Sequence, residues 1–306
     1  MPNLLSLIQD GGPVSLVPIL FSAGTGAALL AWTCFIIIGK KQLSSLIVTI
    51  PIGLTILCAV AGYEFGMSQV SDAISEAPED YKEIMTWAGS SVSLYPLFMT
   101  ATLAPISMMG YFVLWLYSLI KDSFNLMSTA VFAASWICCL ALALLTTPIG
   151  HKIGVNDHFQ PLNGIGISVI ILCVISILFS RNSTESESAL MRSFVASILC
   201  ATSISALTLT LHAWGASSAF DALANAPDDL KVPMAANGFF MFKQAQQFFV
   251  PAAALSFVPA GSLISQMKSS NQKQALIGLI FIIGCFFSAY SFSSPDETTF
   301  TELFNL

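Results

Sequence analysis

The chain has 306 residues, of which 55% are hydrophobic and only 9% are charged. Soluble globular domains carry about 25% charged residues, so much of this apolar surface must face lipid, and the composition predicts a polytopic membrane protein. The net charge of −6, without a basic patch, excludes the electrostatic footprint of a nucleic-acid-binding protein.

Apolar stretches of about 20 residues are long enough to cross the hydrocarbon core as helices. About eight stretches meet this criterion, which predicts an all-α, polytopic transmembrane helical bundle. In chain order, the expected spans are 14–38, 43–63, 92–120, 126–147, 162–180, 194–212, 238–264 and 275–292.

The basic residues predict the orientation of these spans, because cytoplasmic loops carry an excess of lysine and arginine. Seven of the eleven basic residues lie between spans 1 and 2, 3 and 4, 5 and 6, or 7 and 8, whereas only Lys82, Lys152 and Lys231 lie on the other side. We therefore expect both termini on the outer, periplasmic side of a bacterial inner membrane.

Two predicted outer loops, residues 62–89 and 211–238, align without a gap at an offset of 149 and share ten of 28 positions. The motif APEDYK, which begins at Ala77, corresponds to APDDLK, which begins at Ala226. The sequence therefore predicts a tandem duplication of a four-helix unit, with residues 1–148 as the first repeat and 149–306 as the second. Because four is an even number of spans, both units face the same way and form a parallel repeat.

Each repeated loop predicts a short outer helix that ends at a proline, Pro78 or Pro227. Acidic residues concentrate around these helices, at the outer ends of spans 2, 3, 6 and 7. Two interpretations are open: a helix that lies on the bilayer surface, or a vestibule that attracts cations. The residues of this predicted outer acidic mouth are Glu64, Asp72, Asp80, Asp221 and Asp229.

Span 3 combines two prolines with two threonines near its middle. Thr100 and Thr102 lie between Pro96 and Pro105. A proline in a membrane helix frees backbone carbonyls that protein or water must satisfy. Kinks at Pro96, Pro105 and, in span 7, Pro251 therefore favour a cavity or pore that these threonines line, with plain kinked helices as the alternative.

Span 7 carries a lysine and three glutamines within an apolar stretch. Lys243 is expected to lie close enough to the outer interface for its ammonium group to reach the headgroups. The glutamines cannot reach as easily and should face protein or water. The lining candidates in this span are Lys243, Gln244, Gln246 and Gln247.

The sequence has no motif typical of an enzyme, with neither H-E-x-x-H nor G-x-S-x-G nor a Walker loop. All seven cysteines fall within apolar stretches without a C-x-x-C pair, and we interpret them as small packing residues. His212 and its repeat equivalent Tyr63 are expected at an outer interface, as polar tips on apolar bodies. We therefore expect a protein that is not an enzyme and has neither a cofactor nor a metal.

The end of span 2 and the entry to span 3 carry a recognisable order of residues. Gly62, Gly66 and Met67 close span 2, and Met85 and Gly89 follow the outer loop, before Thr100, Thr102 and Pro105. This order, with span 2 running outward, resembles the MotA/TolQ/ExbB proton-channel family.

The resemblance has three departures. Only the short GKKQ segment joins spans 1 and 2, where the family has a sizeable cytoplasmic segment, and the family's acidic residue in the third helix is missing near Val92. A duplicated eight-helix chain is also not the usual form of the family. The resemblance implies an oligomeric subunit whose third helices line a pore, with Thr100 and Thr102 as lining residues. It also implies a single-span partner directed to peptidoglycan.

Three functions are open from the sequence. The first is an ion (proton) channel or stator-like component of a larger membrane complex. The second is a secondary transporter-like protein with a site between the two repeats. The third is a non-catalytic membrane scaffold, which the scarcity of deep charges favours, because proton paths usually need Asp, Glu or His in the membrane. In each case we expect a homo- or hetero-oligomer in the lipid bilayer.

Overall fold

The computed structural model describes residues 16–37, 44–121, 187–227, 229–235, 250, 253–254 and 256–292, and within these ranges the chain forms helices and no strands. The all-α prediction is therefore confirmed for the described residues. Five helical segments among them are long and apolar enough to cross a membrane. They are Leu16–Phe35, Leu46–Glu76, Glu79–Leu114, Glu187–Ala224 and Ser269–Phe292.

These five segments overlap predicted spans 1, 2, 3, 6 and 8, although several extend beyond the predicted bounds. Predicted spans 4 and 5, and most of span 7, lie outside the described residues. The count of eight spans and the duplication of a whole four-helix unit therefore stay predictions, as does the division of the chain at residue 148.

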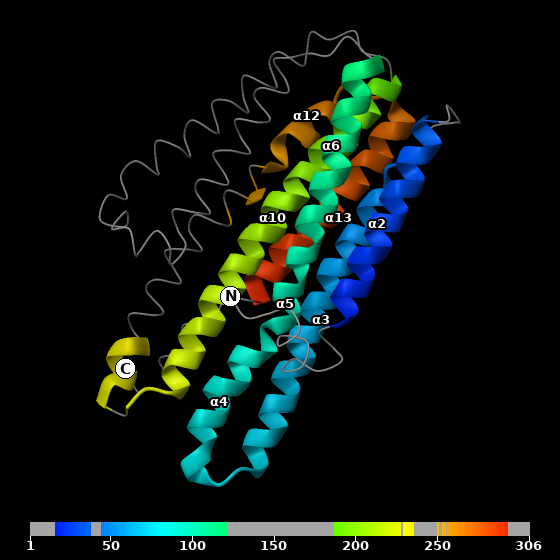
Figure 1. Ribbon diagram of the computed structural model, residues 1–306. Helices are drawn as coiled ribbons and strands as arrows, with labels where there is room; N and C mark the ends of the chain where they lie inside the picture. The colour runs from blue at the N-terminus through cyan, green and yellow to red at the C-terminus, as the bar shows by residue number, and fades with distance from the viewer. Residues whose placement is uncertain are drawn as a thin grey trace, which may run out of the picture.

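The chain order of the helices is as follows: α2 (Leu16–Ile37), α3 (Leu46–Glu76), α4 (Glu79–Ser93), α5 (Tyr95–Phe98), η2 (Met99–Thr102), α6 (Leu103–Lys121), α10 (Glu187–Ala224), α12 (Val258–Ile264) and α13 (Ser269–Phe292). The long helices run along a common direction, and α10 contacts α4, α6, α12 and α13 (Figure 1). On the other side, α3 contacts α2, α4 and α13.

The outer helix predicted between span 2 and Pro78 is not a separate element. Helix α3 continues from the span without a break for 31 residues, because the first residue that stops it is Pro78. At 1.5 Å per residue, α3 is about 46 Å long and exceeds the roughly 30 Å hydrocarbon core. Its distal part pairs with α4 in a hairpin that projects from one end of the bundle (Figure 1).

The two repeated loops have the same backbone conformation at their turns. Helices α3 and α10 both end one or two residues before the shared alanine, and their turns lie at the same end of the bundle (Figure 1). Two backbone hydrogen bonds of the first turn recur in the second turn, 149 residues later. The bond from Ala77 N to Ile74 O (3.2 Å) corresponds to the bond from Ala226 N to Leu223 O (3.3 Å). The bond from Tyr81 N to Pro78 O (3.0 Å) corresponds to the bond from Leu230 N to Pro227 O (2.9 Å).

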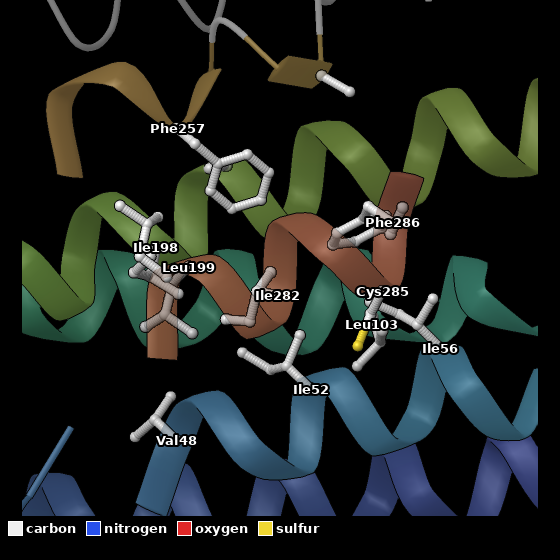
Figure 2. Packing of buried hydrophobic residues seen from close by; sticks show 14 of the residues in the cluster. Val48, Ile52, Ile56, Leu103, Ile198, Leu199, Phe257, Ile282, Cys285 and Phe286 are labelled. Carbon is white, nitrogen blue, oxygen red and sulfur yellow. The ribbon is translucent and has the colours of Figure 1, made fainter. Parts of the chain in front are cut away.

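The core lies where α3, α10 and α13 meet (Figure 2). Val48, Ile52 and Ile56 are spaced four residues apart, so they share one face of α3, and all three are fully buried. Ile282 of α13 points toward this face in Figure 2. By contrast, Met109 of α6 is 70% exposed, as a side chain that faces lipid tails would be.

Two glycines of α13 provide a matched test of this packing. A Cβ atom added at Gly278 would lie 2.7 Å from Oγ1 of the buried Thr49, whereas one added at Gly284 would meet no atom of the described residues within 4 Å. Overpacking a close helix contact costs about 1–3 kcal/mol. Gly278→Leu should therefore lower the free energy of unfolding in mild detergent by this amount. Gly284→Leu should leave it unchanged or raise it, and equal losses in both variants would contradict the packing of α3 on α13.

Candidate functional site

Helix α10 is the most deeply buried of the five candidate spans, and it is rich in hydroxyl side chains. A hydroxyl in an apolar environment needs a hydrogen-bonding partner. Some hydroxyls of α10 find one in their own helix, since Thr208 donates to the Ile204 carbonyl (3.0 Å) and Thr210 to the Ala206 carbonyl (2.8 Å). Others reach neighbouring helices or have no partner among the described residues.

His212 lies at the centre of a polar cluster between α10 and α13. Its side chain is 1% exposed, and its ring is 5.7 Å from the ring of Tyr290 in an edge-on arrangement. The Tyr290 hydroxyl contacts the Thr208 hydroxyl and donates to the Ser205 carbonyl at 3.2 Å. We call His212, Tyr290, Thr208 and Ser205 the histidine cluster.

The polar row continues along α10 beyond this cluster. Thr202, Ser205, Thr208 and His212 are spaced three, three and four residues apart, which places them on one face of the helix. Among the described residues, the hydroxyl oxygens of Thr202 and Ser205 are buried and have no hydrogen-bonding partner. Buried polar atoms generally have a hydrogen-bonding partner in the protein or in ordered water. The row extends about 15 Å along the helix axis.

The histidine cluster combines groups that can pass a proton. An imidazole ring has one nitrogen that can accept a proton and one that can release it, and a hydroxyl donates one hydrogen bond while it accepts others. An ionisable side chain inside a membrane bundle is rare and generally functional. Within the described part of the chain, no group of three or more His, Cys, Asp or Glu side chains is arranged to hold a metal ion.

The predicted lining residues Thr100 and Thr102 lie inside the bundle, in the short 3-10 helix η2. Thr100 is fully buried; its hydroxyl donates to the Leu97 carbonyl (2.7 Å) and is 3.5 Å from the Thr210 hydroxyl of α10. Thr102 donates to the Ser22 hydroxyl of α2 at 2.7 Å. Within one chain, these threonines therefore connect neighbouring helices. That they line a pore in an oligomer stays a prediction.

The two prolines of span 3 lie where one helical segment ends and the next begins. Pro96 is in the first turn of α5, after α4 ends at Ser93, and Pro105 is the third residue of α6, directly after η2. A proline has no N–H to donate to the carbonyl four residues earlier, which accounts for these interruptions. Pro251 of span 7 lies outside the described residues.

The acids of the predicted outer mouth gather at the projecting end of the bundle. Glu64 and Asp72 lie on the distal part of α3, Asp80 on α4, Asp221 near the end of α10 and Asp229 in the helix 229–235, and all five are exposed. The nearby lysines form ion pairs: Lys82 with Glu79 at 2.7 Å, and Lys231 with Glu83 at 3.1 Å. A vestibule that attracts cations stays a prediction.

The polar residues of span 7 lie outside the described residues, so the structure does not place them. They are Lys243, Gln244, Gln246 and Gln247.

The histidine cluster was not predicted from the sequence. His212 was expected at an outer interface with its polar tip accessible; it is buried instead, because α10 is covered on several sides by α4, α6 and α13. Its depth in the membrane stays a prediction. The signal was present in the segment ATSISALTLTLHAW, where Thr202, Ser205 and His212 repeat at helical spacing. Its partner Tyr290 lies 78 residues away in another span, which spacing alone cannot show.

No protein-family model matches this chain, and neither a curated protein nor a solved structure matches it. The resemblance to the MotA/TolQ/ExbB family therefore stays a prediction.

Proposed function

We propose that the chain is an integral membrane subunit that conducts protons, either as an ion channel or as a stator-like component of a larger membrane complex. The observation that carries this proposal is the complete burial of His212 inside the helix bundle. Burying an ionisable group in a membrane protein costs free energy, so such groups generally persist where they serve transport or binding.

The proposed path follows the polar row of α10. Exposed acids at the projecting end, such as Glu64 and Asp221, raise the local concentration of cations. A proton then reaches the imidazole of His212 and passes by way of the Tyr290 and Thr208 hydroxyls toward Thr202. The buried hydroxyls of Ser205 and Thr202 supply positions for water molecules that complete the chain.

The family resemblance supports the same function. It concerns residues from Gly62 to Pro105, and the proton-channel family it points to uses oligomeric subunits with a single-span partner. The family's third helix carries an acidic residue, and this chain has none near Val92. In this proposal His212, from the second half of the chain, takes over the role of proton carrier.

Two alternatives each have an observation in their favour. A scaffold subunit is favoured by hydroxyls that bond within their own helix, as Thr208 and Thr210 do, because such bonds occur in purely structural helices. A secondary transporter with a site between the two repeats is favoured by the location of the hydroxyl pairs Thr100–Thr210 and Ser91–Ser217, which join the first half to the second.

Reconstitution into liposomes separates these functions. The purified chain should admit protons when a potassium diffusion potential drives them, as reported by a pH-sensitive dye inside the vesicles. A scaffold should leave the vesicles as tight as empty ones. A coupled transporter should move protons only after a second solute is added, and either result would overturn the proposal.

A further inference from the structure

The polar row of α10 becomes apolar on the far side of Thr202. Counting backward from Thr202 along the same face gives Ile198, Phe194 and Met191, at spacings of four, four and three residues. Each of these three side chains is at most 1% exposed. The proton path proposed above therefore meets an apolar segment of the bundle once it has passed Thr202.

Helix α13 runs parallel to α10 beside this segment. At the start of both helices, the Glu187 carboxylate of α10 accepts a hydrogen bond from Nδ2 of Asn271 at 2.8 Å. Farther along both helices, Thr208 contacts Tyr290. The two contacts are 21 residues apart on α10 and 19 residues apart on α13. The helices therefore advance together, and Thr208 and Tyr290 lie at the same height along the bundle.

Helix α3 runs in the same direction along α13. Gly278 of α13 lies against Thr49 of α3, and Phe281 lies against Gly53. Because both contacts occur in the same order along the two chains, α3 and α13 are parallel. Thr49 is therefore at the same height along the bundle as Gly278.

A second set of hydroxyls lies on α3, beyond the apolar segment of α10. Ser45 and Thr49 are four residues apart and therefore share one face of the helix. Both are fully buried, and neither hydroxyl oxygen has a hydrogen-bonding partner among the described residues. The hydroxyls of Thr202 and Ser205 have the same property on α10. Unpartnered hydroxyls are thus present at two different heights in the bundle.

The separation of the two sets follows from the helix contacts. Thr202 is six residues before Thr208 on α10. Gly278, the neighbour of Thr49, is twelve residues before Tyr290 on α13. Because Thr208 and Tyr290 lie level, the nearest hydroxyls of the two sets are about six residues apart along the bundle, which is roughly 9 Å.

Isoleucines from three helices fill this interval. Ile52 of α3, Ile198 of α10 and Ile282 of α13 are all fully buried, and Figure 2 shows their side chains in the space between the helices that carry them. Ile282 is four residues beyond Gly278, and Ile198 is four residues before Thr202. We call these three residues the isoleucine layer, and it separates the two sets of hydroxyls.

An apolar layer of this kind treats protons and other cations differently. Hydrophobic constrictions close a path by excluding water. A sodium or potassium ion must carry its water shell across the layer or lose it, and both are unfavourable. A proton needs only a brief single file of water molecules, each of which accepts one proton and releases another.

We propose that the isoleucine layer is the selectivity barrier of the proton path, and that Thr49 and Ser45 receive the proton on its far side. The inference rests on the proposed function, because a barrier has a role only where a path exists. It accounts for a discrimination that the histidine cluster does not supply, since hydroxyl oxygens are ligands for sodium and potassium as well as carriers of protons.

Residue 282 allows the polarity of the layer to be separated from its shape. Ile282→Thr and Ile282→Val leave side chains of nearly equal size, so they differ mainly in one hydroxyl. In liposomes, Ile282→Thr should raise the proton flux at least about tenfold over Ile282→Val. Only the threonine variant should also admit potassium, as reported by a potassium-sensitive dye. Ile280→Thr, on the same helix but 62% exposed, is the control and should conduct as the wild type does.

The outcomes distinguish the barrier from conduction itself. The wild-type flux tests proton conduction, and the ratio between the two variants at residue 282 tests the isoleucine layer. A wild type that conducts, with equal proton flux in Ile282→Thr and Ile282→Val, would overturn the barrier and leave the proposed function in place. Vesicles that stay tight with the wild type and with both variants would overturn both.

The far side of the barrier has a test of its own. Thr49→Val keeps the shape of the side chain and removes the hydroxyl, so it should lower the proton flux well below the wild-type rate. Thr33 provides the control, because it is buried on α2 and its hydroxyl donates to the Leu29 carbonyl at 2.8 Å. Thr33→Val should conduct as the wild type does, and equal fluxes in the two valine variants would remove Thr49 from the path.

Discussion

Replacing Trp87 with alanine is expected to lower the free energy of unfolding by about 3–5 kcal/mol, the usual cost of truncating a buried aromatic side chain. Trp87 is 2% exposed and packs with Leu223 and Ala235 of the second half, in addition to its stacking on Phe220. It therefore holds the projecting hairpin to the end of α10. We expect the loss to appear as a lower midpoint of denaturant unfolding in mild detergent.

The location of Trp87 explains why its effect should exceed that of an aromatic residue deeper in the bundle. Inside a bilayer, lipid tails are as apolar as the core, so burial gains little from the hydrophobic effect. With the third span at residues 92–120, as the sequence predicts, Trp87 lies outside the hydrocarbon core, where water competes for its side chain and burial counts in full. Tyr81, on the same helix but 59% exposed, is the control, and a loss from Tyr81→Ala as large as that from Trp87→Ala would contradict this interpretation.

Replacing His212 with leucine is expected to reduce proton flux into liposomes by about 100-fold, within the range that a positioned proton-transfer group contributes. Leucine fills much of the volume of the imidazole in an apolar site, so the helices should still assemble. The variant removes the group that accepts and releases the proton, while the hydroxyls of Tyr290 and Thr208 remain. Flux is measured with a dye that reports the internal pH, at a fixed ratio of protein to lipid.

Tyr63 provides the matched control for His212, because it occupies the equivalent position in the first repeat and is partly buried on α3. Tyr63→Leu should conduct at the wild-type rate, since Tyr63 does not belong to the histidine cluster. A His212→Leu protein that elutes as the wild type does on size exclusion and conducts at the same rate would remove His212 from the path.

Much of the fold could be predicted from the sequence, because a membrane span is recognised by its length and its apolar composition. The five described spans lie at predicted positions, and the prolines at 78 and 227 mark the two turns correctly. The sequence predicted that span 2 ends near residue 63 and that a separate short helix follows, but α3 is continuous to Glu76. Hydropathy shows where the apolar stretch ends, and a helix can continue beyond that point. From the end of the predicted span at residue 63 to Ala77 the sequence has no proline, and this is the signal that α3 continues to Glu76.

The candidate site was harder to predict, because it depends on which helices become neighbours. Thr208 and Tyr290 meet across 82 residues of sequence, and Thr100 and Thr210 across 110. Lipid does not sort helix faces as water does, since both lipid and the bundle interior accept apolar side chains. A serine or threonine in a span therefore indicates that a hydrogen-bonding partner is needed, but the sequence around it does not show which residue that partner is.

Electrical recording from the purified protein in a planar bilayer, with different pH on the two sides, tests proton conduction by this chain. We expect a current whose reversal potential follows the proton gradient and does not move when potassium or chloride is exchanged. A bilayer that stays silent at high protein density, or a reversal potential set by another ion, would contradict it.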